Sequence, residues 1–269
     1  MTGNLLLVSS NRDSASRNMA QHLIENYGFK ETSEQFEDSP IYQKDETRLI
    51  RTEKELLHLN DPGFKPDAYI FLSKHRSESQ IPTLTAHFPG NFSEDASYGG
   101  NPRELGYTYP SLHRAYLKNL EQLREHVPDY KIVTEPMHHG PTSFQTPVLF
   151  VEIGSSEERW NDQLAVETVC EAVVKTITNH HSPAEKIAVG FGGTHYSEKF
   201  TQLVIETSYA LGAIAPKYAL QHINQPIINQ MKSRCSEKIT YAIIDWKGVN
   251  DRPRIISLAE ETGLEIVKV

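Results

Sequence analysis

The chain has 269 residues, of which 38% are hydrophobic and 23% charged, a balance typical of a globular protein with a substantial core. Its net charge of −8 argues against an extended grip on nucleic acid, which needs many Lys and Arg contacts to phosphate. A short local contact remains compatible with that charge. No apolar run approaches the roughly 20 residues that span a bilayer, so we expect no membrane association. The two cysteines, Cys170 and Cys235, form no metal or redox motif, which favours buried thiols in a reducing cytoplasm.

Short apolar runs alternate with helical patterns along the chain. The runs are rich in branched or aromatic residues and bounded by Gly, Pro, Ser, Asp or Asn, as buried strands are. They comprise residues 5–8, 68–72, 131–133, 148–153, 187–191, 241–244 and 264–267. Helical periodicity covers residues 13–23, 111–120, 163–178 and 198–211, with Asp13 and Ser111 as N-caps of the first two and Gly212 as C-cap of the last.

This alternation predicts an α/β fold with a mostly parallel sheet covered on both faces. We expect one domain over residues 1–269, because no linker, repeat or low-complexity tract divides the chain. Residues 77–110 interrupt the pattern with recurring prolines and glycines. A connection of this length is usually functional or disordered, and its aromatic and histidine content argues against disorder. We therefore expect an ordered loop over the active-site face.

The segment Glu135-Pro136-Met137-His138-His139-Gly140-Pro141-Thr142 is the most unusual in the chain. It holds two imidazoles between prolines, with a carboxylate before them and another, Glu152, in the strand that follows. Imidazole nitrogen and carboxylate oxygen are donors that suit Zn²⁺. A pair of adjacent histidines is often only part of an exposed loop, so the pair alone is a weak signal.

A third imidazole, His195, lies in Gly190-Phe191-Gly192-Gly193-Thr194-His195-Tyr196, directly after an apolar run. Ligands bind at the carboxyl ends of strands in open α/β sheets. Several histidine segments at strand ends therefore indicate a hydrolytic site. No Gly-x-Ser-x-Gly motif occurs and neither cysteine has a telling neighbourhood, which argues against covalent catalysis.

Six segments carry a resemblance in their order and spacing. They are Ser73-Lys74-His75-Arg76-Ser77, His87-Phe88-Pro89-Gly90-Asn91, Glu135 to Thr142, Val151-Glu152-Ile153-Gly154-Ser155, Gly190 to Tyr196 and Pro216-Lys217-Tyr218. Together they resemble the archaeal and plant type of D-aminoacyl-tRNA deacylase. The match extends from Leu5 to about Tyr218. Two positions depart from the family pattern: Thr194 stands in place of a third glycine, and Ala213 in place of a histidine after Gly212.

The resemblance implies a fold, a reaction and a cofactor. The fold is a three-layer α/β/α sandwich related to phosphorylases and peptidyl-tRNA hydrolases. The reaction is hydrolysis of the ester between a D-amino acid and the terminal ribose of tRNA, which recycles tRNA charged with the wrong enantiomer. The implied cofactor is zinc, and the partner is the aminoacylated 3′ end of tRNA. We expect a monomer in the cytoplasm.

The site residues are assigned to three roles. The predicted metal ligands are His138, His195, Glu152 and His87, and the predicted catalytic groups are Glu135, His75 and His139. The predicted substrate contacts are Lys74, Arg76 and Lys217 for phosphate, with the backbone N–H groups of Gly192, Gly193 and Thr194 for an oxyanion or a phosphate. Exposed aromatic rings on the long loop, such as Phe92 or Tyr98, would stack on the terminal adenine.

Three points stay open on the sequence alone. Adjacent residues of an extended chain point to opposite faces, so His138 and His139 are not expected to bind one ion unless the loop bends sharply. The competing function is a zinc-dependent hydrolase or a phosphorylase that acts on a small metabolite or nucleoside, and this function suits the net charge. A metal- or nucleotide-binding module without activity is a third reading, which fits the converging polar loops poorly.

Overall fold

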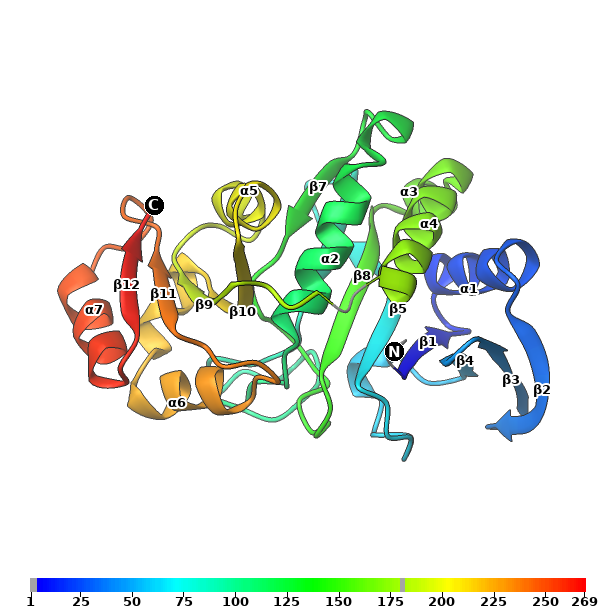
Figure 1. Cartoon of the computed structure of the whole chain (residues 1–269), viewed down its shortest axis with the longest axis horizontal. Helices are drawn as coiled ribbons and strands as arrows, with labels where there is room; N and C mark the ends of the chain where they lie inside the picture. Colours follow the sequence, from blue (N-terminus) through cyan, green and yellow to red (C-terminus); the bar gives the residue numbers. More distant parts are fainter. Residues whose placement is uncertain (1–3, 180–181) are drawn as a thin grey trace.

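The computed structural model describes residues 4–179 and 182–269 and contains two β-sheets (Figure 1). The large sheet has the strand order β2-β3-β4-β1-β5-β8-β6-β7 and the small sheet the order β10-β9-β11-β12. The strands are β1 (Leu5–Ser10), β2 (Lys30–Phe36), β3 (Ser39–Lys44), β4 (Thr47–Thr52), β5 (Ala68–Arg76), β6 (Thr83–His87), β7 (Lys131–Thr134), β8 (Val148–Ser155), β9 (Lys186–Phe191), β10 (Tyr209–Ala215), β11 (Tyr241–Ile244) and β12 (Glu265–Lys268).

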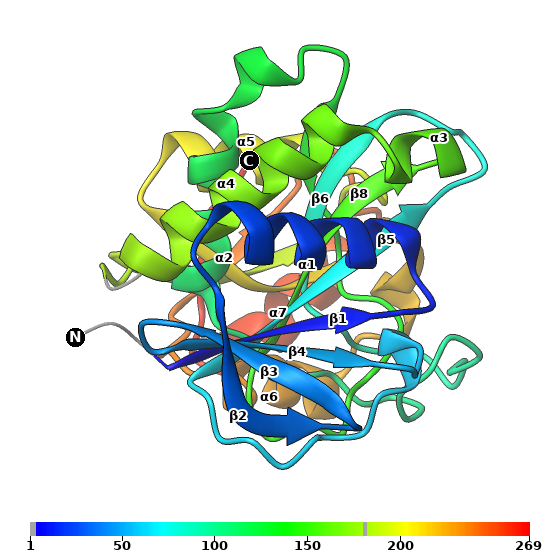
Figure 2. The same ribbon diagram turned by 90° about the vertical axis from the view of Figure 1, so that its right-hand side faces the viewer.

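Seven α-helices occur within the described residues. They are α1 (Ser14–Asn26), α2 (Pro110–Glu121), α3 (Glu157–Trp160), α4 (Gln163–Asn179), α5 (Glu198–Glu206), α6 (Gln225–Ser233) and α7 (Arg252–Glu261), and three short 3-10 helices cover η1 (Leu56–His58), η2 (Arg124–His126) and η3 (Lys217–His222). Helices α1, α2 and α4 pack over one face of the large sheet, and Figure 2 shows α1 above β1 and β4. Within residues 4–179 and 182–269, no helix has the length and apolar character needed to cross a bilayer.

The predicted α/β class, with a mostly parallel sheet flanked by helices, is confirmed. The antiparallel pairings are β2–β3, β3–β4 and β6–β8, while all pairings of the small sheet are parallel. Each predicted strand is present, and so is the predicted cap of α1, where the Asp13 side chain accepts a hydrogen bond from the Ser16 N–H at 3.0 Å. Two sheets replace the single one that the alternation suggested.

Three parts of the secondary structure were not predicted correctly. The helix expected over residues 198–211 ends at Glu206, and Gly212 lies inside strand β10 instead of capping a helix. Strand β6 lies within the segment that was expected to be a loop, where Thr, Leu, Thr, Ala and His alternate and are all buried. Strands β2, β3 and β4 were missed because polar residues dominate them; β2 is Lys-Glu-Thr-Ser-Glu-Gln-Phe and mostly exposed.

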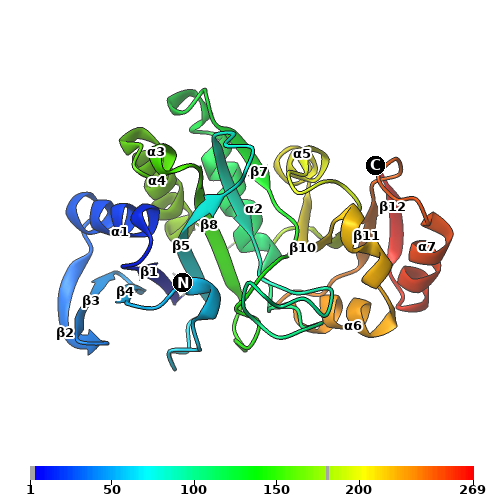
Figure 3. The ribbon, with the colours of Figure 1, turned by 180° about the vertical axis from the view of Figure 1, so that it is seen from behind.

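The two faces of the large sheet are covered in different ways. The helical face holds the main apolar core, with residues such as Leu5, Leu7 and Met19 fully buried. The other face holds a smaller core rich in aromatic rings, covered by side chains from loops and from η1, including Leu56 and Phe144. Figure 3 shows the segment between β6 and α2 beside α6, where the Gln230 side chain binds the backbone of this segment. The polar side chains of the site emerge on this loop-covered face.

Candidate active site

The centre of the site is built from three neighbouring strands, β5, β8 and β6. Glu152 on β8 is in register with Ser73 on β5 and with Thr85 on β6, so the three side chains share one face. His75 and His87 lie two residues further along β5 and β6, on the same face because strand side chains alternate with period two. The Thr85 hydroxyl donates to Glu152 Oε2 at 3.2 Å.

A glycine makes room for one of these imidazoles. Gly154 on β8 pairs with His75, and a Cβ added at Gly154 would lie 2.9 Å from the His75 side chain. Real Cβ contacts are not this short, so any other residue would displace the His75 ring.

The carboxylate of Glu135 lies at the centre of the imidazoles. Its Oε1 is 3.3 Å from His75 Nδ1, and its Oε2 is 3.5 Å from His195 Nε2 and 3.6 Å from His138 Nε2. Both oxygens are buried and neither accepts a hydrogen bond within the described chain. A buried carboxylate without hydrogen bonds is costly unless positive charge compensates it. The sequence prediction that His75, His138 and His195 lie close together is confirmed.

The His138-His139 segment bends sharply. His139 adopts a positive φ of 47°, and the two rings face the same region with centroids 4.3 Å apart. The loop therefore has the sharp bend that His138 and His139 need if both are to bind one ion. The bend is held by the Gly90 N–H, which donates to the His139 carbonyl at 2.8 Å.

Three imidazoles present a free nitrogen to one point. The Nδ1 atoms of His87, His138 and His139 lie 3.2, 2.8 and 2.7 Å from the carbonyl oxygens of Phe88, Pro136 and Gly140. Since a carbonyl only accepts, each Nδ1 carries a hydrogen, and in the neutral form of each ring Nε2 keeps its lone pair. A ligand atom from each of the three rings lies within 4.8 Å of the others. Metal-binding histidines commonly donate their second ring N–H to a carbonyl in this way.

A second group of donors adjoins the first. His75, Glu135 and His195 also offer ligand atoms within 4.8 Å of one another, and Glu152 groups with His87 and Glu135. His75 differs from the other imidazoles because both its nitrogens are engaged: Nε2 is 2.8 Å from the Tyr196 hydroxyl, and Nδ1 is 3.5 Å from Glu152 Oε2 as well as near Glu135. The structure thus brings all seven predicted metal and catalytic residues together. The role of each residue stays a prediction.

The protonation states suit a metal. Burial, with the charges of neighbouring imidazoles, holds the pKa of His138 well below its usual value and lowers the pKa of His139 to about 3 and that of His195 to about 4. These rings are neutral at physiological pH, as metal ligands must be. Burial raises the pKa of Glu135 to about 7.

His75 behaves in the opposite way. Burial alone would lower its pKa, but the hydrogen bond to Glu152 and the charge of Glu135 outweigh burial and raise the pKa to about 10. The same carboxylate, Glu152, raises the pKa of His87 against the effect of burial.

The predicted substrate contacts are divided between two sides of the site. Lys74 and Arg76 line a cavity next to His75, with Lys74 Nζ 5.1 Å from the Trp160 ring centre, whereas Lys217 lies on η3 beyond the glycine turn. The prediction of a free N–H at Gly192 is wrong, because this group donates to the Ala215 carbonyl at 2.9 Å. Strand pairing between β9 and β10 takes this donor. Thr194 is exposed, and its hydroxyl donates to the Tyr196 carbonyl.

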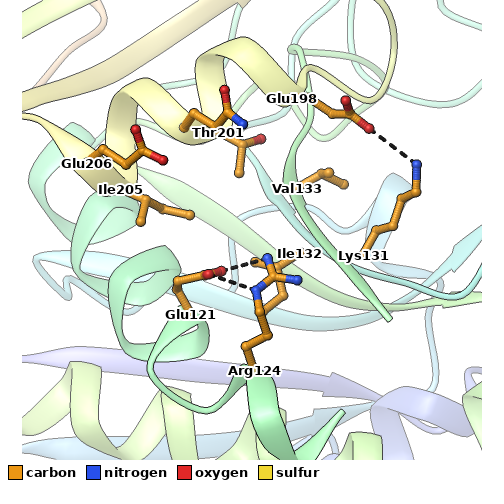
Figure 4. A pocket seen from close by; sticks show the side chains of 10 residues that line it. Glu121, Arg124, Lys131, Ile132, Val133, Glu198, Thr201, Ile205 and Glu206 are labelled. Atoms are coloured by element: carbon orange, nitrogen blue, oxygen red, sulfur yellow. Dashed lines mark hydrogen bonds and ion pairs between the residues drawn. The ribbon is translucent and has the colours of Figure 1, made fainter. Parts of the chain in front are cut away.

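A hollow between α2, β7 and α5 lies apart from this cluster (Figure 4). Its charged groups pair with one another, Glu121 with Arg124 at 2.7 Å and Lys131 with Glu198 at 3.2 Å. None of the predicted site residues lines it. The chemistry of the protein is therefore centred on the histidines.

Comparisons with known proteins agree with this site. Residues 62–267 match the sequence model of the D-aminoacyl-tRNA deacylase family. The chain belongs to that family. Two similar relatives named D-aminoacyl-tRNA deacylase, from Pyrococcus abyssi and Methanocaldococcus jannaschii, are 36% and 38% identical, and each comparison covers 98% of this chain and 99% of the relative. A crystal structure of a conserved protein of unknown function, AF0625, has a TM-score of 0.91 and 28% identity, and the alignment covers 99% of this chain and 95% of that one.

Sequence reasoning missed some residues of this deacylase-family site. Thr85 was given no role, although its place two residues before His87 puts it on the same strand face. Tyr196, next to His195, contacts His75 and was not singled out. Phe92 was expected to be an exposed stacking ring, but it is only 5% exposed because it packs in the core.

Proposed function

We propose that this protein hydrolyses the ester bond of D-aminoacyl-tRNA in a reaction that depends on zinc. The observation that carries the proposal is the buried carboxylate of Glu135, which accepts no hydrogen bond from the described residues, beside three imidazoles whose ligand atoms lie within 4.8 Å of one another. Such a set of donors fits Zn²⁺, which prefers imidazole nitrogen and tolerates carboxylate oxygen. The family membership of the chain supports the ester of D-aminoacyl-tRNA as the substrate.

His87, His138 and His139 would hold the zinc in this proposal. Zinc lowers the pKa of a bound water to about 7 and polarises a carbonyl. The assignment exchanges the predicted roles of His139 and His195: His139 becomes a ligand, and His195, with Nε2 3.5 Å from Glu135 Oε2, contacts the catalytic carboxylate. Glu152 accepts a hydrogen bond from Thr85, and its Oε2 lies 3.6 Å from His87 Nε2, so this carboxylate stays available to the metal.

Glu135 acts as the general base. Its carboxylate takes a proton from water as the water oxygen bonds to the ester carbonyl carbon. The bond from that carbon to the ribose oxygen then breaks, the ribose oxygen takes the proton back from Glu135, and the free D-amino acid and the tRNA are released. A base with a pKa about 7 matches the working pH of the cell, where general base catalysis is most effective. His75, held between Glu135, Glu152 and Tyr196, keeps the carboxylate in position.

The tRNA contact in this proposal is confined to the aminoacylated 3′ end. Lys74 and Arg76 line the cavity beside His75, and Lys217 lines a separate cavity; in this proposal the three side chains carry the charge for phosphates. We also propose that the protein is a monomer of the cytoplasm, a location that the free thiols Cys170 and Cys235 support.

Hydrolysis of D-Tyr-tRNA and L-Tyr-tRNA by the pure protein, with and without a chelator, tests the proposal. We expect rapid loss of the D-tyrosyl ester, much slower loss of the L-tyrosyl ester, and inhibition by the chelator. Equal rates on the two enantiomers would leave an esterase without a role in chiral proofreading. Hydrolysis or phosphorolysis of nucleosides without action on either tRNA would support the competing small-metabolite function.

A further inference from the structure

Two cavities meet at the histidine cluster, and both are lined by His139 and Tyr98. We call the first, of about 350 Å³, the leucine pocket after Leu56 and Leu57 in its wall. The second, of about 340 Å³, is the tyrosine pocket, which is lined by Tyr98 and Tyr218 together with His138 and His139. The two pockets therefore adjoin at one imidazole.

The tyrosine pocket has aromatic rings with open faces. Tyr98 is 71% exposed and Tyr218 57%, and within the described residues they are the two most exposed of the large hydrophobic side chains. Another exposed aromatic residue, Trp246, is flanked by Arg252 and Lys268, which lie 4.9 and 4.3 Å from its ring centre. The two tyrosines thus stand out as uncovered rings next to the catalytic groups.

The backbone fixes both tyrosines to the loops that carry the histidines. The Gly140 N–H donates to the Tyr98 carbonyl at 3.1 Å, and a Cβ at Gly140 would lie 2.3 Å from the Gly100 nitrogen. Only glycine permits this close approach of the two loops. Lys217, next to Tyr218, donates its N–H to the Gly193 carbonyl at 3.0 Å, in the turn that leads to His195. The positions of the two rings are therefore coupled to the positions of the imidazoles.

Resting on the proposed function, we infer that the tyrosine pocket binds the terminal adenine of tRNA and the leucine pocket binds the amino-acid side chain. An aminoacyl ester carries one bulky group on each side of the bond that breaks, and the site has two pockets that share His139. Bases of any sequence stack on open aromatic faces. Apolar side chains suit the walls of Leu56 and Leu57.

The leucine pocket carries charges of both signs. Glu55 and Glu152 line the leucine pocket, where they face the ammonium group of the substrate. Lys217, beside Tyr218, is placed for the phosphate that precedes the adenosine. The leucine pocket also has cations, Lys74 and Arg76 among them. The experiment must therefore distinguish the inferred orientation of the substrate from the reversed one, in which the adenine occupies the leucine pocket.

The test uses the metal-loaded protein and adenosine 5′-monophosphate as a probe of the base site, with ribose 5-phosphate as the control that lacks the base. We expect Tyr218→Ala to weaken adenosine monophosphate binding, followed by NMR, by roughly five- to 150-fold, the range expected for one stacked base. The KM for D-Tyr-tRNA rises by a similar factor while kcat changes little. Tyr218→Phe keeps the ring and the wild-type values.

Leu57→Ala is the matched variant in the other pocket. It leaves adenosine monophosphate binding unchanged and alters the ratio of rates on D-Tyr-tRNA and D-Ala-tRNA. Unchanged binding in Tyr218→Ala, weakened binding in Leu57→Ala, or no base-dependent binding to the wild type overturns the inference. The proposed function fails in a different way, by the absence of hydrolysis in the wild type, because nucleotide binding is measured without any reaction.

Discussion

His75 Nδ1 lies 3.3 Å from Glu135 Oε1, and both side chains are almost completely buried. His75 belongs to strand β5, and Glu135 directly follows strand β7. These two strands are not neighbours in the large sheet, so the contact joins separate parts of it. Glu135 accepts no hydrogen bond from the described residues, so the neighbouring imidazoles are the groups that stabilise its charge. The predictions below test that arrangement.

Glu135→Gln keeps the shape of the side chain and removes the base. We expect kcat for D-Tyr-tRNA to fall by about 10²- to 10⁴-fold, the range for loss of a general base, while the bound zinc is retained. Single-turnover rates and elemental analysis measure the two effects. Glu121→Gln is the control and should keep the wild-type rate, since Glu121 pairs with Arg124 at 2.7 Å in the hollow that lies apart from the cluster. A wild-type kcat in Glu135→Gln would exclude Glu135 as the base.

The imidazoles of the cluster are not equivalent. We expect His87→Ala, His138→Ala and His139→Ala to lose zinc and activity together, because each substitution removes a proposed ligand. In each of these imidazoles the Nδ1 hydrogen is bonded to a backbone carbonyl, as is common for histidines that bind a metal. His195→Ala should lose activity and keep zinc. Elemental analysis of each purified variant decides this, with His22→Ala on the outer side of α1 as the control. If His195→Ala lost zinc while the other three variants kept it, His195 would be a ligand and the assignment would be wrong.

The sequence predicted the residues of this site better than their arrangement. The six segments led to all seven histidine and glutamate residues, because imidazole and carboxylate donors are a restricted set of residue types. The pairing of His87 with His138 and His139 was not predictable, since it depends on the positive φ of His139 and on a parallel bridge between Pro89 and His138. Both are tertiary features that leave no periodic signal.

The fold, too, was predicted correctly in some parts and not in others. Buried apolar runs such as Leu5–Ser10 predicted their strands correctly. The polar strand Lys30–Phe36 was missed because it lies at a sheet edge and has no apolar alternation. The end of α5 was missed because Phe200, Leu203, Val204 and Tyr209 keep a helical spacing across the break. The backbone becomes extended at Thr207 all the same, and Tyr209 starts a strand.

Gly154→Ala tests the space around His75. The new Cβ would lie 2.9 Å from the His75 side chain and from Thr83 Oγ1, so one of them must move. We expect a cost of about 1–3 kcal/mol in the free energy of unfolding, typical of an overpacked interior, and a lower kcat because His75 no longer positions Glu135. Urea unfolding and single-turnover kinetics measure these effects. Wild-type stability together with a wild-type rate would show that the added Cβ does not displace the His75 ring.

His113 gives the fold a pH dependence of its own. Burial lowers the pKa of this imidazole to about 4, from a value of about 6.5 in the unfolded chain. The neutral ring stabilises the fold fully above pH about 6.5. As the pH falls from there toward 4, the unfolded chain binds the extra proton and stability is lost at up to about 1.4 kcal/mol per pH unit. We expect His113→Gln to show a smaller drop in Tm than the wild type between pH 7 and pH 5. Equal drops in the two proteins would contradict this.

Zinc stoichiometry against activity tests the central claim most directly. The protein is stripped with a chelator, zinc is added back in steps, and the metal content and the rate on D-Tyr-tRNA are measured on the same samples. The account predicts that the stripped protein is inactive, that it stays folded, and that the rate rises in proportion to bound zinc. Full activity in a protein without metal, unaffected by the chelator, would contradict the account and leave the histidines as acid–base and RNA-contacting groups.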